Sequence, residues 1–116
     1  MADLIELAER VEKGADVKWL TSDIDDLTRA LIGPSWTMYD RGFADDAIRM
    51  NSLDAVVALL ERVLPGWDWC RLFAPGEHVN CYVRSPCRLK EAVGTAARTE
   101  RALLSATLRA LSEKDR

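Results

Sequence analysis

Four segments of the chain repeat their apolar residues at helical spacing, and one of them also carries its own start and stop signals. After Ser52, a good N-terminal cap, apolar residues recur at i, i+3, i+4, i+7 and i+11 and form a wide apolar face. Pro65-Gly66 ends this helix. The residues of this face are Leu53, Val56, Val57, Leu60 and Leu64. Further helices are expected over residues 4–13, 23–32 and 100–111.

The segment after this helix predicts a β-meander. Residues 67–73 and 78–84 are rich in aromatic and β-branched residues, and turn residues separate them. Residues 89–97 fit either a third strand or the start of a helix, and we favour a strand because Gly94 would weaken a helix. The expected fold is therefore α+β, a small three-stranded antiparallel β-meander packed with α-helices in the order α-α-α-β-β-β-α.

Residues 34–51 show no clear period and are expected to form an aromatic loop. Trp36, Met38, Tyr39 and Phe43 stand there among charged residues. A connection of this length is usually functional or packed as a unit of its own. The aromatic residues favour a segment that packs down onto the rest of the protein.

The length of 116 residues fits one domain, residues 1–116, which is long enough to bury a core without disulfides or metals. We divide it into an N-terminal helical pair (1–33), the aromatic loop (34–51) and a C-terminal unit (52–116). Apolar residues make up 48% of the chain and charged residues 30%, which is ordinary for a globular domain.

The charge is unevenly distributed along the chain. Residues 1–66 carry 7 Lys/Arg against 13 Asp/Glu, whereas residues 67–101 carry 6 against 4. The acidic front half would repel a polyanion, so nucleic acid is not an expected partner. No signal-like segment and no apolar run of roughly 20 residues occurs, so we expect a cytoplasmic protein with no membrane contact. In that compartment Cys70, Cys81 and Cys87 are expected to be free thiols.

Three segments resemble the phage ABA sandwich domain family, a set of small, mostly uncharacterised proteins of phages and prophages. The most specific segment is Ser52-Leu53-Asp54-Ala55 with Leu64-Pro65-Gly66-Trp67-Asp68-Trp69, and the others are Leu4-Ile5-Glu6 with residues 22–33 and the closing helix, residues 99–111. The chain departs from the family pattern at Glu100, where proline is frequent, and at Ser105, where cysteine is frequent. The matched positions are caps, stops and core residues. The resemblance therefore implies a phage setting and an ABA-sandwich-like fold, a small antiparallel sheet with helices around it, but no reaction.

The register expected for the hairpin divides its residues between a core face and a mixed face. A turn centred between Pro75 and Gly76 pairs Cys70 with Cys81 and makes one face plainly apolar. The other face interleaves aromatic rings with cations, as nucleotide-binding surfaces do. This predicts a ligand site made of Trp69, Arg71, His78, Tyr82 and Arg84, helped by Trp36 and Tyr39. The alternative, which we favour, is that a second helix layer covers this face and buries the rings.

Residues typical of catalysis or metal binding do not occur in a recognisable pattern. His78 is the only histidine, and no nucleophile motif or phosphate-binding glycine loop accompanies it. The three cysteines and His78 lack the paired spacing of zinc ligands. The acidic clusters, Asp23/Asp25/Asp26 and Asp45-Asp46, are typical of solvated helix starts. We therefore expect no catalytic residue, no metal and no cofactor, and a protein that is not an enzyme.

Two functional hypotheses follow. The first is a non-enzymatic phage or prophage accessory protein that acts by binding, as a protein-interaction or assembly module and as a homo-oligomer. It predicts an exposed apolar patch or an open sheet edge. The alternative is a sponge for a small nucleotide signal that counters a host defence system. It predicts an open pocket lined by Trp69, Arg71, Tyr82 and Arg84.

Overall fold

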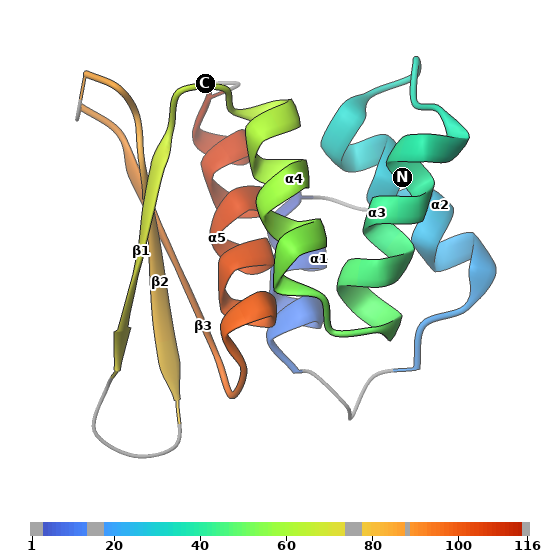
Figure 1. Ribbon diagram of the computed structural model, residues 1–116, viewed down its shortest axis with the longest axis horizontal. Helices are drawn as coiled ribbons and strands as arrows, with labels where there is room; N and C mark the ends of the chain where they lie inside the picture. The colour runs from blue at the N-terminus through green and yellow to red at the C-terminus, as the bar shows by residue number, and fades with distance from the viewer. Residues whose placement is uncertain (1–3, 14–17, 74–77, 88, 115–116) are drawn as a thin grey trace.

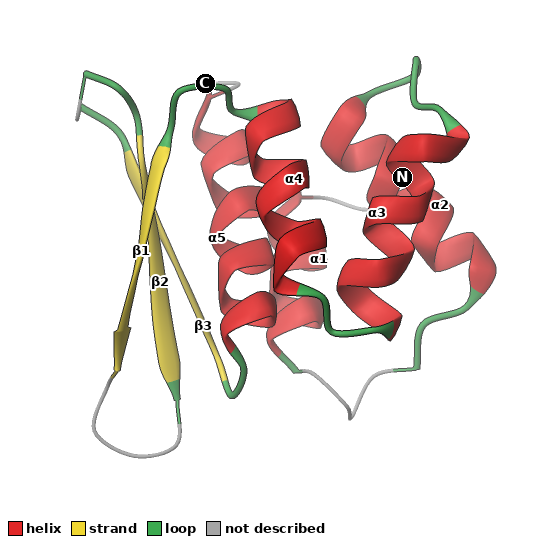
Figure 2. Ribbon diagram, in the orientation of Figure 1, coloured by secondary structure: helices red, strands yellow, loops and turns green. Residues whose placement is uncertain are grey.

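The computed structural model describes residues 4–13, 18–73, 78–87 and 89–114, and within them the chain forms five helices and a three-stranded sheet. Figures 1 and 2 show all of these helices on one side of the sheet. The elements, in order, are α1 (Leu4–Glu12), α2 (Thr21–Ile32), α3 (Met38–Arg49), α4 (Leu53–Val63), β1 (Asp68–Phe73), β2 (Val79–Arg84), β3 (Glu91–Ala96) and α5 (Thr99–Lys114). The α+β class and the antiparallel meander are confirmed, with the strands in the order β1-β2-β3.

Four helices precede the strands instead of three, because residues 38–49 form α3 where we expected a loop. The start of α3 explains why it forms. The Thr37 hydroxyl accepts a hydrogen bond from the amide of Asp40, and the Asp40 carboxylate accepts one from the amide of Thr37 at 3.0 Å. This reciprocal pair satisfies two amide donors that a helix start otherwise leaves free.

The last helix, α5, is the centre of the fold. It packs against β2 and β3 on one side and against α1, α3 and α4 elsewhere. Residues 100–108 are all buried, so the helix has no solvent face over two turns. The apolar face of this helix, Leu104, Leu108 and Leu111, is buried. Small residues between these leucines let the sheet and the other helices approach the same helix from different sides.

Gly94 is the point at which the sheet meets α5 most closely. A Cβ atom at this position would lie 2.2 Å from the carbonyl oxygen of Ala102 and 2.5 Å from the amide nitrogen of Ala106. Both contacts are with backbone, which a side-chain rotation cannot relieve. Glycine is therefore required here by close packing of strand on helix.

Ion pairs join α1 to the last helix, α5, and to its neighbour α2. The Glu12 carboxylate accepts hydrogen bonds from the Arg109 guanidinium at 2.8 Å and from the backbone amide of Thr95, on the edge strand β3, at 3.0 Å. Arg10 pairs with Asp23 at 2.9 Å, and its guanidinium lies 4.5 Å from the centre of the Trp19 ring. None of the helices in the described residues is long and apolar enough to cross a membrane.

The Arg10–Asp23 pair predicts an acid-sensitive part of the stability. The hydrogen bond from Arg10, and next that from the Leu20 amide, lower the pKa of Asp23 below its ordinary value of 3.8. A carboxyl whose pKa is lowered by folding stabilises the protein above its ordinary pKa and loses that contribution as the pH falls through its folded pKa. We expect Asp23→Asn to lower the urea midpoint at pH 7 and to change it much less at pH 3. Asp26→Asn, which removes a half-exposed carboxylate 3.7 Å from Arg29, is the control and should change neither midpoint appreciably.

Candidate functional site

The hairpin register differs by one residue from the expected one and redistributes the predicted ligand residues. Cys70 pairs with Tyr82, and Arg71 pairs with Cys81. A shift of one residue turns every side chain of a strand to the other face of the sheet. The expected turn between Pro75 and Gly76 lies outside the described residues, but the pairing of Phe73 with Val79 shows that five residues separate the strands instead of four.

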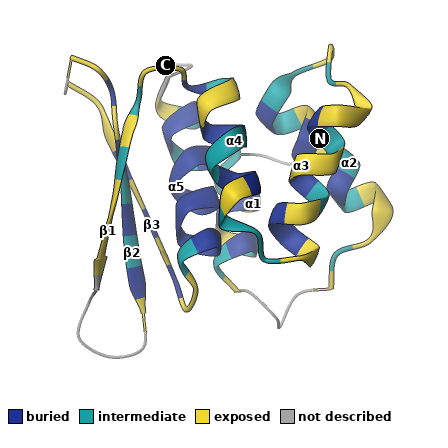
Figure 3. Ribbon diagram, viewed as in Figure 1, coloured by how far each residue is buried: buried dark blue, intermediate teal, exposed yellow. Residues whose placement is uncertain are grey.

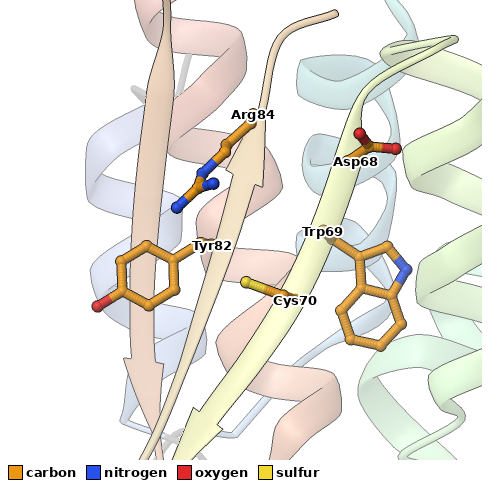
Figure 4. A pocket seen from close by; sticks show the side chains of 5 residues that line it. All are labelled: Asp68, Trp69, Cys70, Tyr82 and Arg84. Carbon is orange, nitrogen blue, oxygen red and sulfur yellow. The ribbon is translucent and has the colours of Figure 1, made fainter. Parts of the chain in front are cut away.

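The predicted site is therefore divided between the two faces of the sheet. Trp69 and Arg71 lie on the helix-facing side, where Arg71 donates a hydrogen bond to the Thr99 hydroxyl at 3.4 Å. Tyr82 and Arg84 alternate with buried Val83 and lie on the other face. Figure 4 shows the Trp69 indole on the opposite side of β1 from Cys70 and Tyr82. These four residues do not form one stacking surface.

The outer face of the sheet is open, which corrects the expectation of a second helix layer. No helix in the described part of the chain lies on that side (Figure 1), and its side chains form three cross-strand rows. The rows are Asp68–Arg84–Glu91, Cys70–Tyr82–Val93 and Leu72–Asn80–Thr95. Arg84 lies between two carboxylates and pairs with Glu91 at 2.7 Å, so its charge is compensated within the protein.

A small hollow on this face is the remaining part of the predicted nucleotide site. It is lined by Asp68, Cys70, Tyr82 and Arg84 of the outer face and by Trp69, whose indole lies on the opposite side of β1, and it has a volume of about 90 Å³ (Figure 4). Pockets for small-molecule ligands usually measure 300–1,000 Å³. The hollow can hold a few waters or a single small group, and a carboxylate in its lining disfavours a phosphate.

The remaining predicted residues lie apart from this hollow. His78 is exposed just before β2. Trp36 and Tyr39 belong to the turn before α3 and to α3 itself, which lies beyond α4 and α5 from the sheet in Figure 1. Tyr39 is 82% exposed and does not pack onto the rest of the protein, contrary to expectation. The acidic clusters are used in local structure, for example Asp25 in an ion pair with Arg41 at 2.6 Å, and no group of potential metal ligands assembles within the described residues.

The cysteines are free thiols, as expected, but in three different environments. Cys81 is fully buried and donates to the carbonyl of Thr99 at 3.7 Å, and its burial raises its pKa to about 11. Cys87 is exposed, and hydrogen bonds from the Ser85 hydroxyl and then from the Leu89 amide lower its pKa. Cys70 is exposed on the outer sheet face, so it cannot bridge to Cys81.

These environments predict an order of thiol reactivity. At pH 8 a thiol-specific reagent should modify Cys87 first and Cys70 next, because only thiolates in contact with solvent react. Cys81 should react only when the protein unfolds. Ser85→Ala should slow Cys87 relative to Cys70, and peptide mapping by mass spectrometry after timed labelling measures all three rates. Rapid labelling of Cys81 in the native protein would contradict this assignment.

Several exposed apolar residues gather on α3, a helix that sequence reasoning missed because it treated residues 34–51 as a loop. One side of this helix is buried through Asp40, Ala44, Ala47 and Ile48. The opposite side should be polar in an ordinary surface helix. It carries instead what we name the α3 stripe: Met38, Tyr39, Gly42, Phe43, Asp46 and Met50. The sequence signals that indicate it are the Thr37-x-x-Asp40 cap and apolar residues spaced four apart at 39 and 43.

The α3 stripe is shallowly hollowed and strongly exposed. Met38 and Met50 are 73% and 72% exposed, and Phe43 is 37% exposed. The rings of Tyr39 and Phe43 lie 6.5 Å apart. Gly42 lies between these side chains and leaves a hollow of about 400 Å³ above the helix. Figure 3 shows exposed segments alternating with buried ones along α3. The stripe offers apolar contact area around one carboxylate, which suits another protein surface better than a polar metabolite.

Comparison of the chain with protein-family models, with curated proteins and with solved structures found no match. Function is therefore inferred from the geometry of the outer sheet face and of the α3 stripe.

Proposed function

We propose that this chain is a non-enzymatic binding protein, a protein-interaction or assembly module that uses the α3 stripe as its binding surface. The observation that carries the proposal is the exposure of three large apolar side chains, Met38, Tyr39 and Phe43, which line one hollow on the outward side of α3, with exposed Met50 directly after the helix. Their contiguity matters, because single exposed apolar residues are common whereas contiguous patches mark binding sites.

The rigidity of α3 supports the proposal. The helix is capped at its start by Thr37 and Asp40, and the Asp40 carboxylate lies 3.6 Å from Arg62 of α4. Its inner side is anchored by Ala44 and Ile48 in the core. A helix held in this way presents its outer side chains without a large loss of conformational entropy on binding.

The resemblance to phage and prophage proteins gives the proposal a setting. An accessory protein of that kind, expressed in a host cell, needs a binding surface and no catalytic machinery. The nucleotide-sponge alternative is less well supported, because Trp69 and Arg71 lie on a different face from Tyr82 and Arg84 and the hollow beside Arg84 holds only about 90 Å³.

Photo-crosslinking in the cell that naturally makes the protein tests this proposal. A benzophenone amino acid replaces Met38, which is 73% exposed on the α3 stripe, in one variant and Leu89, which is 86% exposed outside α3, in the control variant. We expect a discrete covalent adduct with a protein from position 38, and none from position 89. Adding Phe43→Asp to the position 38 variant should remove the adduct. Equal labelling from both positions would show that the stripe has no specific partner.

A further inference from the structure

We infer that the occupant of the α3 stripe is a second copy of this chain, packed with its α3 antiparallel to the first about a twofold axis near Gly42 and Phe43. This inference rests on the proposed function, since it names the partner of the same surface. Two features of the stripe support it: the place of its one carboxylate and the glycine at its centre.

The carboxylate of Asp46 lines the α3 hollow together with Met38, Tyr39 and Phe43, so a surface that covers the hollow removes it from water. An unpaired buried charge costs several kcal/mol, so the partner must supply a hydrogen-bond donor at that place. In an antiparallel pair centred between positions 42 and 43, residue 46 of one copy lies beside residue 39 of the other. The Tyr39 hydroxyl of the second copy can then donate to Asp46, and the N-terminal end of its α3 adds favourable positive potential. The same contact is made twice by symmetry.

Parallel packing of the two α3 helices supplies no hydrogen-bond donor beside Asp46. It would place Asp46 beside Asp46 of the second copy, two like charges with no donor from the stripe between them. Charge complementarity therefore selects the antiparallel arrangement.

Gly42 has no function within its own chain that explains a glycine. A Cβ atom there would have no heavy atom within 4 Å, and the backbone is regular helix in which glycine costs about 0.5–1 kcal/mol relative to alanine. Its effect is external, because a helix without a side chain at the contact allows a second helix to approach more closely. Near the twofold axis, Gly42 of one copy lies beside Gly42 of the other, and the two Phe43 rings pack against each other. The phenylalanines therefore form the centre of the interface.

The first test is the molecular mass of the purified protein by analytical ultracentrifugation across a concentration series. We expect a reversible dimer in the wild type. Phe43→Asp should weaken it by at least about 30-fold, as for a central binding residue. The matched control is Leu72→Asp, which places the same charge at a 52% exposed leucine on the sheet and should leave the dimer intact. A dimer that is lost with Leu72→Asp and retained with Phe43→Asp overturns the inference.

The second test addresses the antiparallel register. Tyr39→Glu places a carboxylate beside Asp46 at both contacts and should weaken the dimer. An equimolar mixture of Tyr39→Glu and Asp46→Arg proteins should form a heterodimer, because one contact becomes Glu–Arg and the other keeps the native Tyr–Asp pair. A mixture that associates no better than Tyr39→Glu alone overturns the register.

The two proposals fail in different ways. A wild-type protein that stays monomeric at about 100 micromolar, roughly a hundred times the dissociation constant of a dimer with a Kd of about 1 micromolar, overturns the second-copy inference. If the crosslinker at position 38 then captures a different protein, the binding function of the stripe stands. If the crosslinker captures no protein, both the binding function of the stripe and the second-copy inference are wrong.

Discussion

Replacing Gly94 with alanine is expected to destabilise the fold by about 3 kcal/mol or more, a large fraction of the 5–15 kcal/mol that a domain of this kind usually has. The added methyl group would lie 2.2 and 2.5 Å from backbone atoms of Ala102 and Ala106, so α5 must move away from the sheet. That movement also disturbs the helices on the other sides of α5. Urea unfolding followed by circular dichroism measures the loss.

A matched glycine provides the control for this experiment. Gly42→Ala adds the same methyl group in regular helix with no atom within 4 Å and should raise the stability of the dilute protein by about 0.5–1 kcal/mol. If Gly94→Ala lowers the free energy of unfolding and Gly42→Ala raises it, close packing, and not backbone conformation, requires Gly94. A Gly94→Ala protein as stable as the wild type would mean that α5 does not rest on β3 as described.

Leu108→Ala is the second substitution with a large expected effect, a loss of about 3 kcal/mol within the 2–5 kcal/mol range of leucine truncations in cores. Leu108 is 0% exposed and lies on the one helix that contacts the sheet and three other helices. The neighbouring elements cannot all collapse into the space that it leaves. The midpoint of urea unfolding should fall with little change in the slope of the transition.

Leu89→Ala is the control for the leucine substitution. Leu89 is 86% exposed, so the same truncation should change the stability by less than about 0.5 kcal/mol. Comparable losses at Leu89 and Leu108 would contradict the central position of α5.

Much of the fold could be predicted from local pattern. Ser52 caps α4 through a 3.1 Å bond from the Ala55 amide, and Pro65-Gly66 follows the helix where the stop was expected. The meander was predicted from aromatic and β-branched residues in its strands and from the turn residues between them. Gly94 was assigned to a strand because it disfavours helix, and the structure gives it a stronger reason, the contact with α5.

The errors have specific causes. The helix α3 was missed because Gly42 interrupts its helical propensity and apolar residues occupy both sides, so no single face stands out as amphipathic. The hairpin register was missed because a loop of four residues and one of five fit the same sequence, while Cys70 and Cys81 are each acceptable in a core. In the observed register Trp69 and Arg71 lie on one face of the sheet and Tyr82 and Arg84 on the other, so the predicted mixed aromatic and basic surface does not form. The surface that does exist, the α3 stripe, depended on the missed helix.

Oxidative footprinting of Met38 and Met50 in living cells tests the central claim, that the α3 stripe is covered by another protein chain. Both side chains are more than 70% exposed in the isolated chain and should oxidise rapidly in dilute purified protein. In cells we expect their modification to be slowed several-fold relative to that of exposed residues outside α3, such as Leu89. Equal rates in cells and in dilute solution would show that the stripe stays open and that it is not the binding surface.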